Sequence, residues 1–138
     1  MRSPQIFDKR TKYLYLLPLT IMGIIFYLSH QPNVMDGMPE IPFLDKVFHF
    51  IAYFALGFSF CISLSFNRWP RWGPLSFLFT MLYAMSDEIH QTFVPSRAFE
   101  VSDFLADVFG GLVAVMVFRY LMRTFSRLPQ SRMMRSSF

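Results

Sequence analysis

Residues 47–66 read VFHFIAYFALGFSFCISLSF, and this run decides the fold because it contains no Lys, Arg, Asp or Glu. An α-helix rises about 1.5 Å per residue, so roughly 20 apolar residues span the ~30 Å hydrocarbon core of a bilayer. The apolar residues form a continuous block, whereas in the amphipathic helices of soluble proteins they recur every three or four positions. The run therefore predicts a transmembrane helix.

The chain contains three further apolar runs of similar length, at 13–29, 74–93 and 101–122. With 54% hydrophobic and only 16% charged residues, the composition also favours a membrane protein over a soluble domain. The first run is too long for a secretory signal, and no small-residue cleavage site follows it. We expect an all-α polytopic membrane protein with four transmembrane helices in a compact bundle at 13–122, between a segment at 1–12 and a basic tail at 123–138.

The basic residues predict the orientation of this bundle. They gather before the first run, between the second and third runs and after the last run, whereas only Lys46 and Arg97 lie in the other two connections. Because Lys and Arg are retained on the cytoplasmic side during insertion, both termini should be cytoplasmic and the protein should be a multi-pass protein of the cell membrane. Attraction to anionic lipid headgroups accounts for the net charge of +4, so we expect the lipid bilayer and not nucleic acid as the partner.

Polar side chains lie within one or two turns of the outer end of every predicted helix. A charged residue at the centre of a transmembrane helix costs about 2.5–3.5 kcal/mol, so such a cluster should be paired, hydrated or functional. Spacings of three or four residues place members from one helix on one face. The members are Asp45, His49 and Tyr53 beside Lys46; Asp87, His90 and Gln91 beside Glu88; Asp103 and Asp107; and Arg97 in the last connection. We expect them to line one polar pocket facing the extracytoplasmic side.

Three motifs, DKxxHxxxYxxxG (45–57), SDEIHQxFxPxR (86–97) and DxxxDxxG (103–110), resemble those of the VanZ-like membrane proteins. The resemblance covers about 29–111 and implies a bacterial multi-pass protein of the cell envelope. The member that gives the family its name is associated with low-level resistance to the glycopeptide teicoplanin. Two positions depart from the family pattern: Ser96 stands where the family usually has Gly, and Asp107, which adds a negative charge, stands where it usually has Asn.

The polar cluster has two interpretations that need no catalysis. In the first, the groups only pair with one another, Asp87 or Glu88 with Arg97, and Asp45 or Asp103 with Lys46. In the second, the protein is a noncatalytic lipid- or drug-binding or scaffold protein, in which Arg97 and Lys46 bind an anionic ligand.

The third interpretation is an enzyme acting on an amphiphilic substrate, such as an anionic lipid or a cell-wall precursor in the outer leaflet. His90 or His49 would act as general base or acid, and Asp87 and Glu88 would orient the imidazole or hold a divalent metal. The predicted substrate-binding residues are Arg97, Lys46, Gln91, Asp45, Tyr53, Asp103 and Asp107. No spacing matches an established metal motif, so we predict no metal site from the sequence. The sequence assigns no cofactor and leaves the oligomeric state open.

Overall fold

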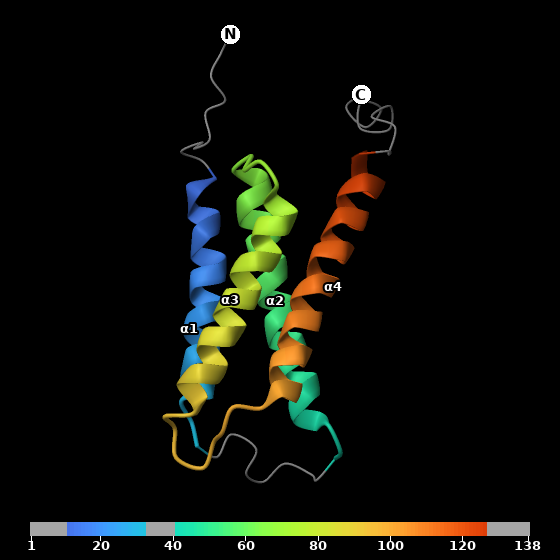
Figure 1. Cartoon of the computed structure of the whole chain (residues 1–138). Helices are drawn as coiled ribbons and strands as arrows, with labels where there is room; N and C mark the ends of the chain where they lie inside the picture. Colours follow the sequence, from blue (N-terminus) through green and yellow to red (C-terminus); the bar gives the residue numbers. More distant parts are fainter. Residues whose placement is uncertain (1–10, 33–40, 127–138) are drawn as a thin grey trace, which may run out of the picture.

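A computed structural model describes residues 11–32 and 41–126, and helices form its regular structure in these ranges (Figure 1). A 3₁₀ turn, η1 (Lys12–Tyr15), leads into α1 (Leu16–Ser29), which is followed by α2 (Leu44–Phe66), α3 (Trp72–Gln91) and α4 (Val101–Ser126). Each apolar run forms a helix, so the all-α prediction is confirmed for this part of the chain. The predicted N-terminal segment up to residue 10 and the basic tail from residue 127 lie outside the described residues.

Three helical stretches are long and apolar enough to cross a membrane: Lys12–Ser29, Leu44–Phe66 and Val101–Ser126. Three of the four predicted runs thus form helices with the length and apolar composition of membrane spans. The remaining helix, α3, has 20 residues, but Asp87 and Glu88 near its end lower its mean hydropathy. A fourth crossing thus stays a prediction.

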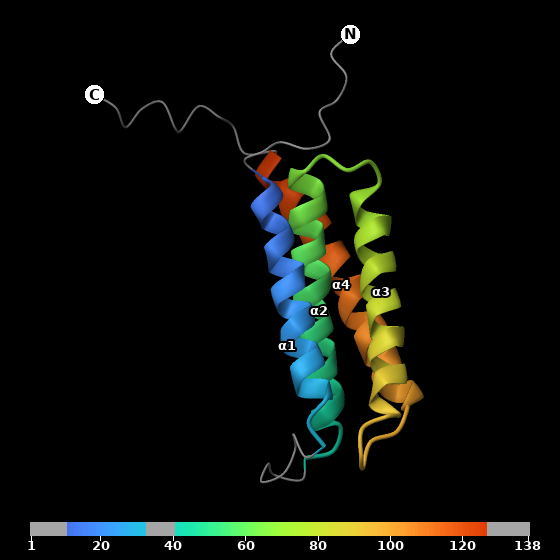
Figure 2. The same cartoon turned by 90° about the vertical axis from the view of Figure 1, so that its left-hand side faces the viewer.

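Successive helices run in opposite directions and lie side by side (Figures 1 and 2). The beginning of α1 and the end of α4 lie at one end of the bundle, and the end of α1 and the connection between α3 and α4 lie at the other. Helix α2 contacts the other three helices, and its most extensive packing is with α4. The ends of α1 and α3 therefore meet the beginnings of α2 and α4 at one end of the bundle.

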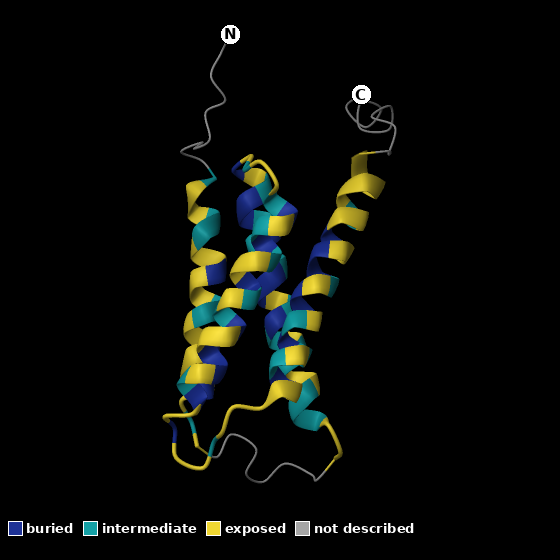
Figure 3. Cartoon of the chain, viewed as in Figure 1, coloured by how far each residue is buried: buried dark blue, intermediate teal, exposed yellow. Residues whose placement is uncertain are grey.

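The outer surface of the bundle is apolar along much of its length. Figure 3 shows buried positions on the helix faces that meet and exposed positions on the faces that point outward. Large apolar side chains are among the exposed ones, including Leu16, Ile24, Leu105, Phe109 and Met116. Such a surface is costly in water, but acyl chains solvate it as well as a protein interior would.

Glycines allow α2 and α4 to approach closely. A Cβ atom at Gly57 would lie 3.1 Å from the Cα of Gly111, and one at Gly110 would lie 2.5 Å from the carbonyl oxygen of Phe50. Water does not drive helix association within a bilayer, so close backbone packing of small residues contributes much of the stability. Since the atoms facing Gly110 belong to the backbone of α2, they cannot move without displacing the helix.

We predict that Gly110→Ala lowers the stability of the bundle by about 1–3 kcal/mol, the usual cost of overpacking. The measurement is the midpoint of thermal unfolding of the detergent-purified protein. Gly23→Ala is the matched control, because nothing lies within 4 Å of a Cβ atom there. Gly23→Ala should unfold at the midpoint of the unmodified protein or above it, since Ala favours helix more than Gly does. Equal midpoints for both variants would contradict the close packing of α2 and α4.

Candidate functional site

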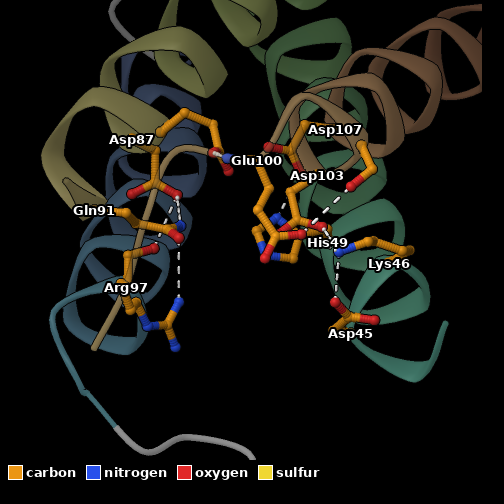
Figure 4. A network of polar contacts seen from close by, with 12 residues as sticks. Asp45, Lys46, His49, Asp87, Gln91, Arg97, Glu100, Asp103 and Asp107 are labelled. Atoms are coloured by element: carbon orange, nitrogen blue, oxygen red, sulfur yellow. Dashed lines mark hydrogen bonds and ion pairs between the residues drawn. The ribbon is translucent and has the colours of Figure 1, made fainter. Parts of the chain in front are cut away.

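A pocket of about 770 Å³ lies at the end of the bundle where α1 and α3 end. All four helices and the connection between α3 and α4 contribute to its lining. The residues that line it are Ile25, Leu28, Ser29, Pro32, Asp45, Phe48, His49, Ile51, Ala52, Tyr53, Asp87, Gln91, Ser96, Arg97, Ala98, Glu100 and Asp103. Figure 4 shows the polar residues in two groups, with Asp87, Gln91 and Arg97 on one side and Asp45, Lys46, His49, Asp103 and Asp107 on the other. Most of the predicted site residues therefore lie in one shared polar region, as expected.

Backbone contacts fix the connection that carries Arg97. The amide of Arg97 donates to the carbonyl of Val94 over 3.1 Å, which closes a turn. Ser96, within this turn, has a φ of 65°, a left-handed conformation that glycine adopts without steric cost. The backbone at position 96 therefore suits glycine, the residue that the VanZ-like proteins usually have there. The amide of Glu100 then donates to Oε2 of Glu88 over 3.0 Å, which joins the start of α4 to the end of α3.

Lys46 is surrounded by three carboxylates. Its Nζ lies 2.6 Å from Oδ2 of Asp45, 2.8 Å from Oε2 of Glu100 and 2.5 Å from Oδ1 of Asp103. A lysine ammonium has three N–H donors, and these three carboxylates occupy all of them. The predicted pairing of Lys46 with Asp45 and Asp103 is confirmed, whereas the ligand contact expected of Lys46 would require one of these ion pairs to open.

His49 is oriented by a buried carboxylate one helix away. Its Nδ1 lies 2.9 Å from Oδ1 of Asp107, which is 0% exposed. Because an ionised carboxylate only accepts hydrogen bonds, Nδ1 carries a proton, and in the neutral imidazole Nε2 has a lone pair. Nε2 lies 3.7 Å from Oδ2 of Asp103, at the pocket wall. The lone pair of His49 therefore faces a second carboxylate.

Three buried carboxylate oxygens on this side have no hydrogen-bond partner among the described residues: Oε1 of Glu88, Oδ1 of Asp103 and Oδ2 of Asp107. Of these, Oδ1 of Asp103 is bound in the ion pair with Lys46. The side chain of Glu88 is 0% exposed, and its other oxygen is occupied by the amide of Glu100. Leaving a buried polar atom unpaired costs about 1–3 kcal/mol, and more when the group is charged. This side of the pocket thus holds two buried carboxyl oxygens that no described residue binds.

Neutral donors stabilise Asp87 on the opposite side. Its Oδ2 accepts hydrogen bonds from Ser29 Oγ over 2.8 Å and from Tyr53 OH over 3.1 Å. Gln91 Nε2 lies 3.5 Å from the same oxygen, at the limit of a hydrogen bond. These contacts join α1, α2 and α3 around one carboxylate.

The guanidinium of Arg97 is bound by neutral acceptors only. Its Nε donates to the carbonyl of Gln31 over 3.0 Å, and its Nη1 donates to Oε1 of Gln91 over 3.3 Å. No carboxylate in the ranges 11–32 and 41–126 forms an ion pair with it. The predicted pairing of Arg97 with Asp87 or Glu88 is therefore not found. No described carboxylate compensates the positive charge that Arg97 brings to the pocket.

His90 lies apart from the pocket lining. Its Nε2 lies 3.4 Å from Nδ1 of His30, and its ring packs against Phe26 with the centroids 4.7 Å apart. Of the two histidines predicted as acid or base, the structure brings only His49 to the other polar residues. The sequence places Ser29 and Glu100 at the same outer end of the helices but did not identify them as catalytic or substrate-binding residues, although side chains at helix ends often bind helix termini.

We predict that Lys46→Met destabilises the protein by roughly 1.5–3 kcal/mol, the usual contribution of a hydrogen bond to a charged group. The substitution leaves three carboxylates side by side without their shared ammonium. Thermal unfolding in detergent measures the effect, and Lys12→Met, which removes an exposed lysine at the opposite end of the bundle, is the control. If both variants unfold at the midpoint of the unmodified protein, Lys46 does not hold these carboxylates together.

Comparison with known proteins identifies the family of this chain. A family model described as VanZ/LLP1 matches residues 2–123. The match includes α1, α2 and α3, most of α4 and every residue that lines the pocket. No curated protein and no solved structure matches the chain. Because the family model extends over most of the 138 residues, the resemblance expected from the motifs is confirmed, and the chain belongs to the VanZ/LLP1 family.

Proposed function

We propose that this VanZ-type membrane protein binds the headgroup of an anionic amphiphile, a lipid or a cell-wall precursor, in the pocket at the extracytoplasmic side. Arg97 is the observation that carries the proposal. Its charge is uncompensated by any described carboxylate, and neutral contacts to Gln31 and Gln91 hold the guanidinium at the pocket. The planar fork of arginine suits the paired oxygens of a phosphate or carboxylate.

The apolar part of the pocket favours a ligand with an acyl or prenyl chain. Phe48 and Ile51 line the pocket and are still 44% and 55% exposed. They lie on a helix that is long and apolar enough to cross the membrane, so their exposed surface would face lipid. Ile25 and Leu28 of α1 extend this wall. A headgroup near Arg97 could therefore leave its chain in the bilayer.

The proposal includes four crossings in a cell membrane, with both ends of the chain in the cytoplasm. Helix α3 runs between the same two ends of the bundle as the other three helices (Figures 1 and 2), so a bilayer that surrounds them would surround it too. Its polar residues Asp87, Glu88 and Gln91 are each no more than 3% exposed, which keeps them away from acyl chains. The distribution of Lys and Arg supports the cytoplasmic placement of the ends.

We predict that a cysteine at Thr92 is labelled by a membrane-impermeant thiol reagent on intact cells. Thr92 is exposed at the pocket end of the bundle, and the buried Cys61, the one native cysteine, is first replaced by Ser. Ser126→Cys is the matched control at the opposite end of the bundle and should react only after the cells are permeabilised. The reverse pattern would place the pocket on the cytoplasmic side.

We predict that Arg97→Gln weakens binding of an anionic lipid roughly 10- to 100-fold. A charge-assisted hydrogen bond contributes about 1.5–3 kcal/mol, and about 1.4 kcal/mol corresponds to a factor of ten. Native mass spectrometry of the detergent-purified protein would compare phosphatidic acid and a polyprenyl phosphate with zwitterionic phosphatidylcholine. Arg68→Gln, which removes an exposed arginine at the opposite end, should retain the preference for anionic lipid.

The same measurement distinguishes the alternative that the polar cluster is structural. In that case the unmodified protein would show no preference between anionic and zwitterionic lipids, or Arg97→Gln and Arg68→Gln would behave alike. The resistance to glycopeptides associated with the family would follow from the proposal only if a cell-wall precursor is the preferred ligand.

A further inference from the structure

We propose that His49, Glu88 and Asp103 form a binding site for one divalent transition metal ion, such as Zn²⁺ or Mn²⁺, at the wall of the pocket. These residues come from α2, α3 and α4. Each offers one ligand atom, and the three atoms lie within 4.8 Å of one another. A mixed set of one imidazole and two carboxylates is typical of Zn²⁺ and Mn²⁺ sites.

The unpartnered oxygen of Glu88 is the independent sign of a missing cation. Glu88 is completely buried, its Oε2 accepts a hydrogen bond from the Glu100 amide, and its Oε1 has no partner within the described ranges. A metal ion satisfies such an oxygen without a donor hydrogen. The three-residue cluster therefore includes a buried carboxyl group with one unsatisfied oxygen.

The hydrogen bond between His49 and Asp107 prepares the imidazole as a ligand. Asp107 Oδ1 holds the proton on Nδ1 at 2.9 Å, so the lone pair is on Nε2. Metal-binding histidines usually donate their other N–H to a carboxylate or carbonyl in this way. Asp107 is thus a positioning residue for His49 and need not touch the ion.

The separation of the ligand atoms suits an ion between them. Nε2 of His49 and Oδ2 of Asp103 lie 3.7 Å apart. Two atoms bound at about 2.1 Å to one ion lie roughly 3.0–3.5 Å apart at the angles of octahedral or tetrahedral coordination. An ion would draw them together slightly, and it would separate two lone pairs that otherwise repel each other.

A second acidic cluster next to this site does not need an ion. Asp45, Glu100 and Asp103 also come close enough to hold one, but Lys46 Nζ already contacts all three carboxylates. These three carboxylates are thus bound by a cation of the protein itself, whereas Oε1 of Glu88 has no partner among the described residues. A divalent ion at His49, Glu88 and Asp103 would bind this oxygen and lower the negative charge on this side of the pocket.

His49 and Asp103 line the pocket, so the ion would have coordination positions open to a ligand. An ion with open positions polarises a phosphoryl or carbonyl oxygen that binds to it. Only this contact with a headgroup rests on the proposed function, whereas binding of the metal alone does not.

The test uses the full chain in detergent, stripped with a chelator and then incubated with Zn²⁺ or Mn²⁺ alone. Elemental analysis after desalting gives the stoichiometry, and calorimetry gives the affinity. We expect about one equivalent per chain, and binding at least tenfold weaker for His49→Gln and Glu88→Gln. The double variant His30→Gln, His90→Gln is the matched control, because it removes the other two of the three histidines. It should still bind about one equivalent of metal per chain.

Thermal unfolding separates loss of the site from loss of the fold. Gln at position 88 retains the acceptor for the Glu100 amide, so Glu88→Gln without metal should unfold no earlier than the unmodified protein. Added metal should raise the midpoint of the unmodified protein and leave that of Glu88→Gln unchanged.

Absence of binding to the unmodified protein would overturn the site, as would full binding by Glu88→Gln or loss of binding in the double histidine variant. Arg97→Gln should bind the metal normally. Normal metal binding without any preference for anionic lipid would therefore contradict the proposed function alone.

Discussion

Carboxylates buried at the pocket end of the bundle are the constraint on which the rest of the structure depends. Withdrawing a charge from water costs several kcal/mol unless pairing and hydrogen bonds compensate it. Asp87 is compensated by neutral donors from α1 and α2, and Lys46 compensates three carboxylates at the start of α2 and α4. Apart from the pair of Lys46 with Asp45 within α2, these contacts join different parts of the bundle, so the same bonds that satisfy the charges hold this end together.

The geometry around His49 also depends on the close approach of α2 and α4. Gly110 packs against the backbone of Phe50, the neighbour of His49, and Asp107 lies about one turn before Gly110 on the same helix. Any side chain at 110 would push the two helices apart at this point and lengthen the 2.9 Å bond between His49 and Asp107. Glycine packing, which looks purely structural, therefore sets the distances in the polar site.

The sequence predicted the helices well because length and apolar composition are local properties, and the motif spacing predicted most of the polar region because helical periodicity fixes which residues share a face. Periodicity does not fix how each helix is rotated against its neighbours. His90 and Gln91 are adjacent in the sequence, yet Gln91 lines the pocket while His90 packs beside His30. The contact of Arg97 with Gln31 was equally beyond prediction, because a backbone carbonyl carries no sequence signal.

The two sides of the pocket differ in charge, and this difference limits what can bind there. Among the described residues no carboxylate pairs with Arg97, whereas on the side of His49 the carboxyl groups of Asp45, Glu88, Glu100, Asp103 and Asp107 outnumber the single ammonium of Lys46. An anionic headgroup in contact with Arg97 would be repelled by that opposite side, since Coulomb interactions are strong where water is scarce. A divalent ion at His49 would reverse the local sign and allow one headgroup to contact both sides. The metal site and the headgroup site are therefore electrostatically coupled, and occupancy of the first should favour occupancy of the second.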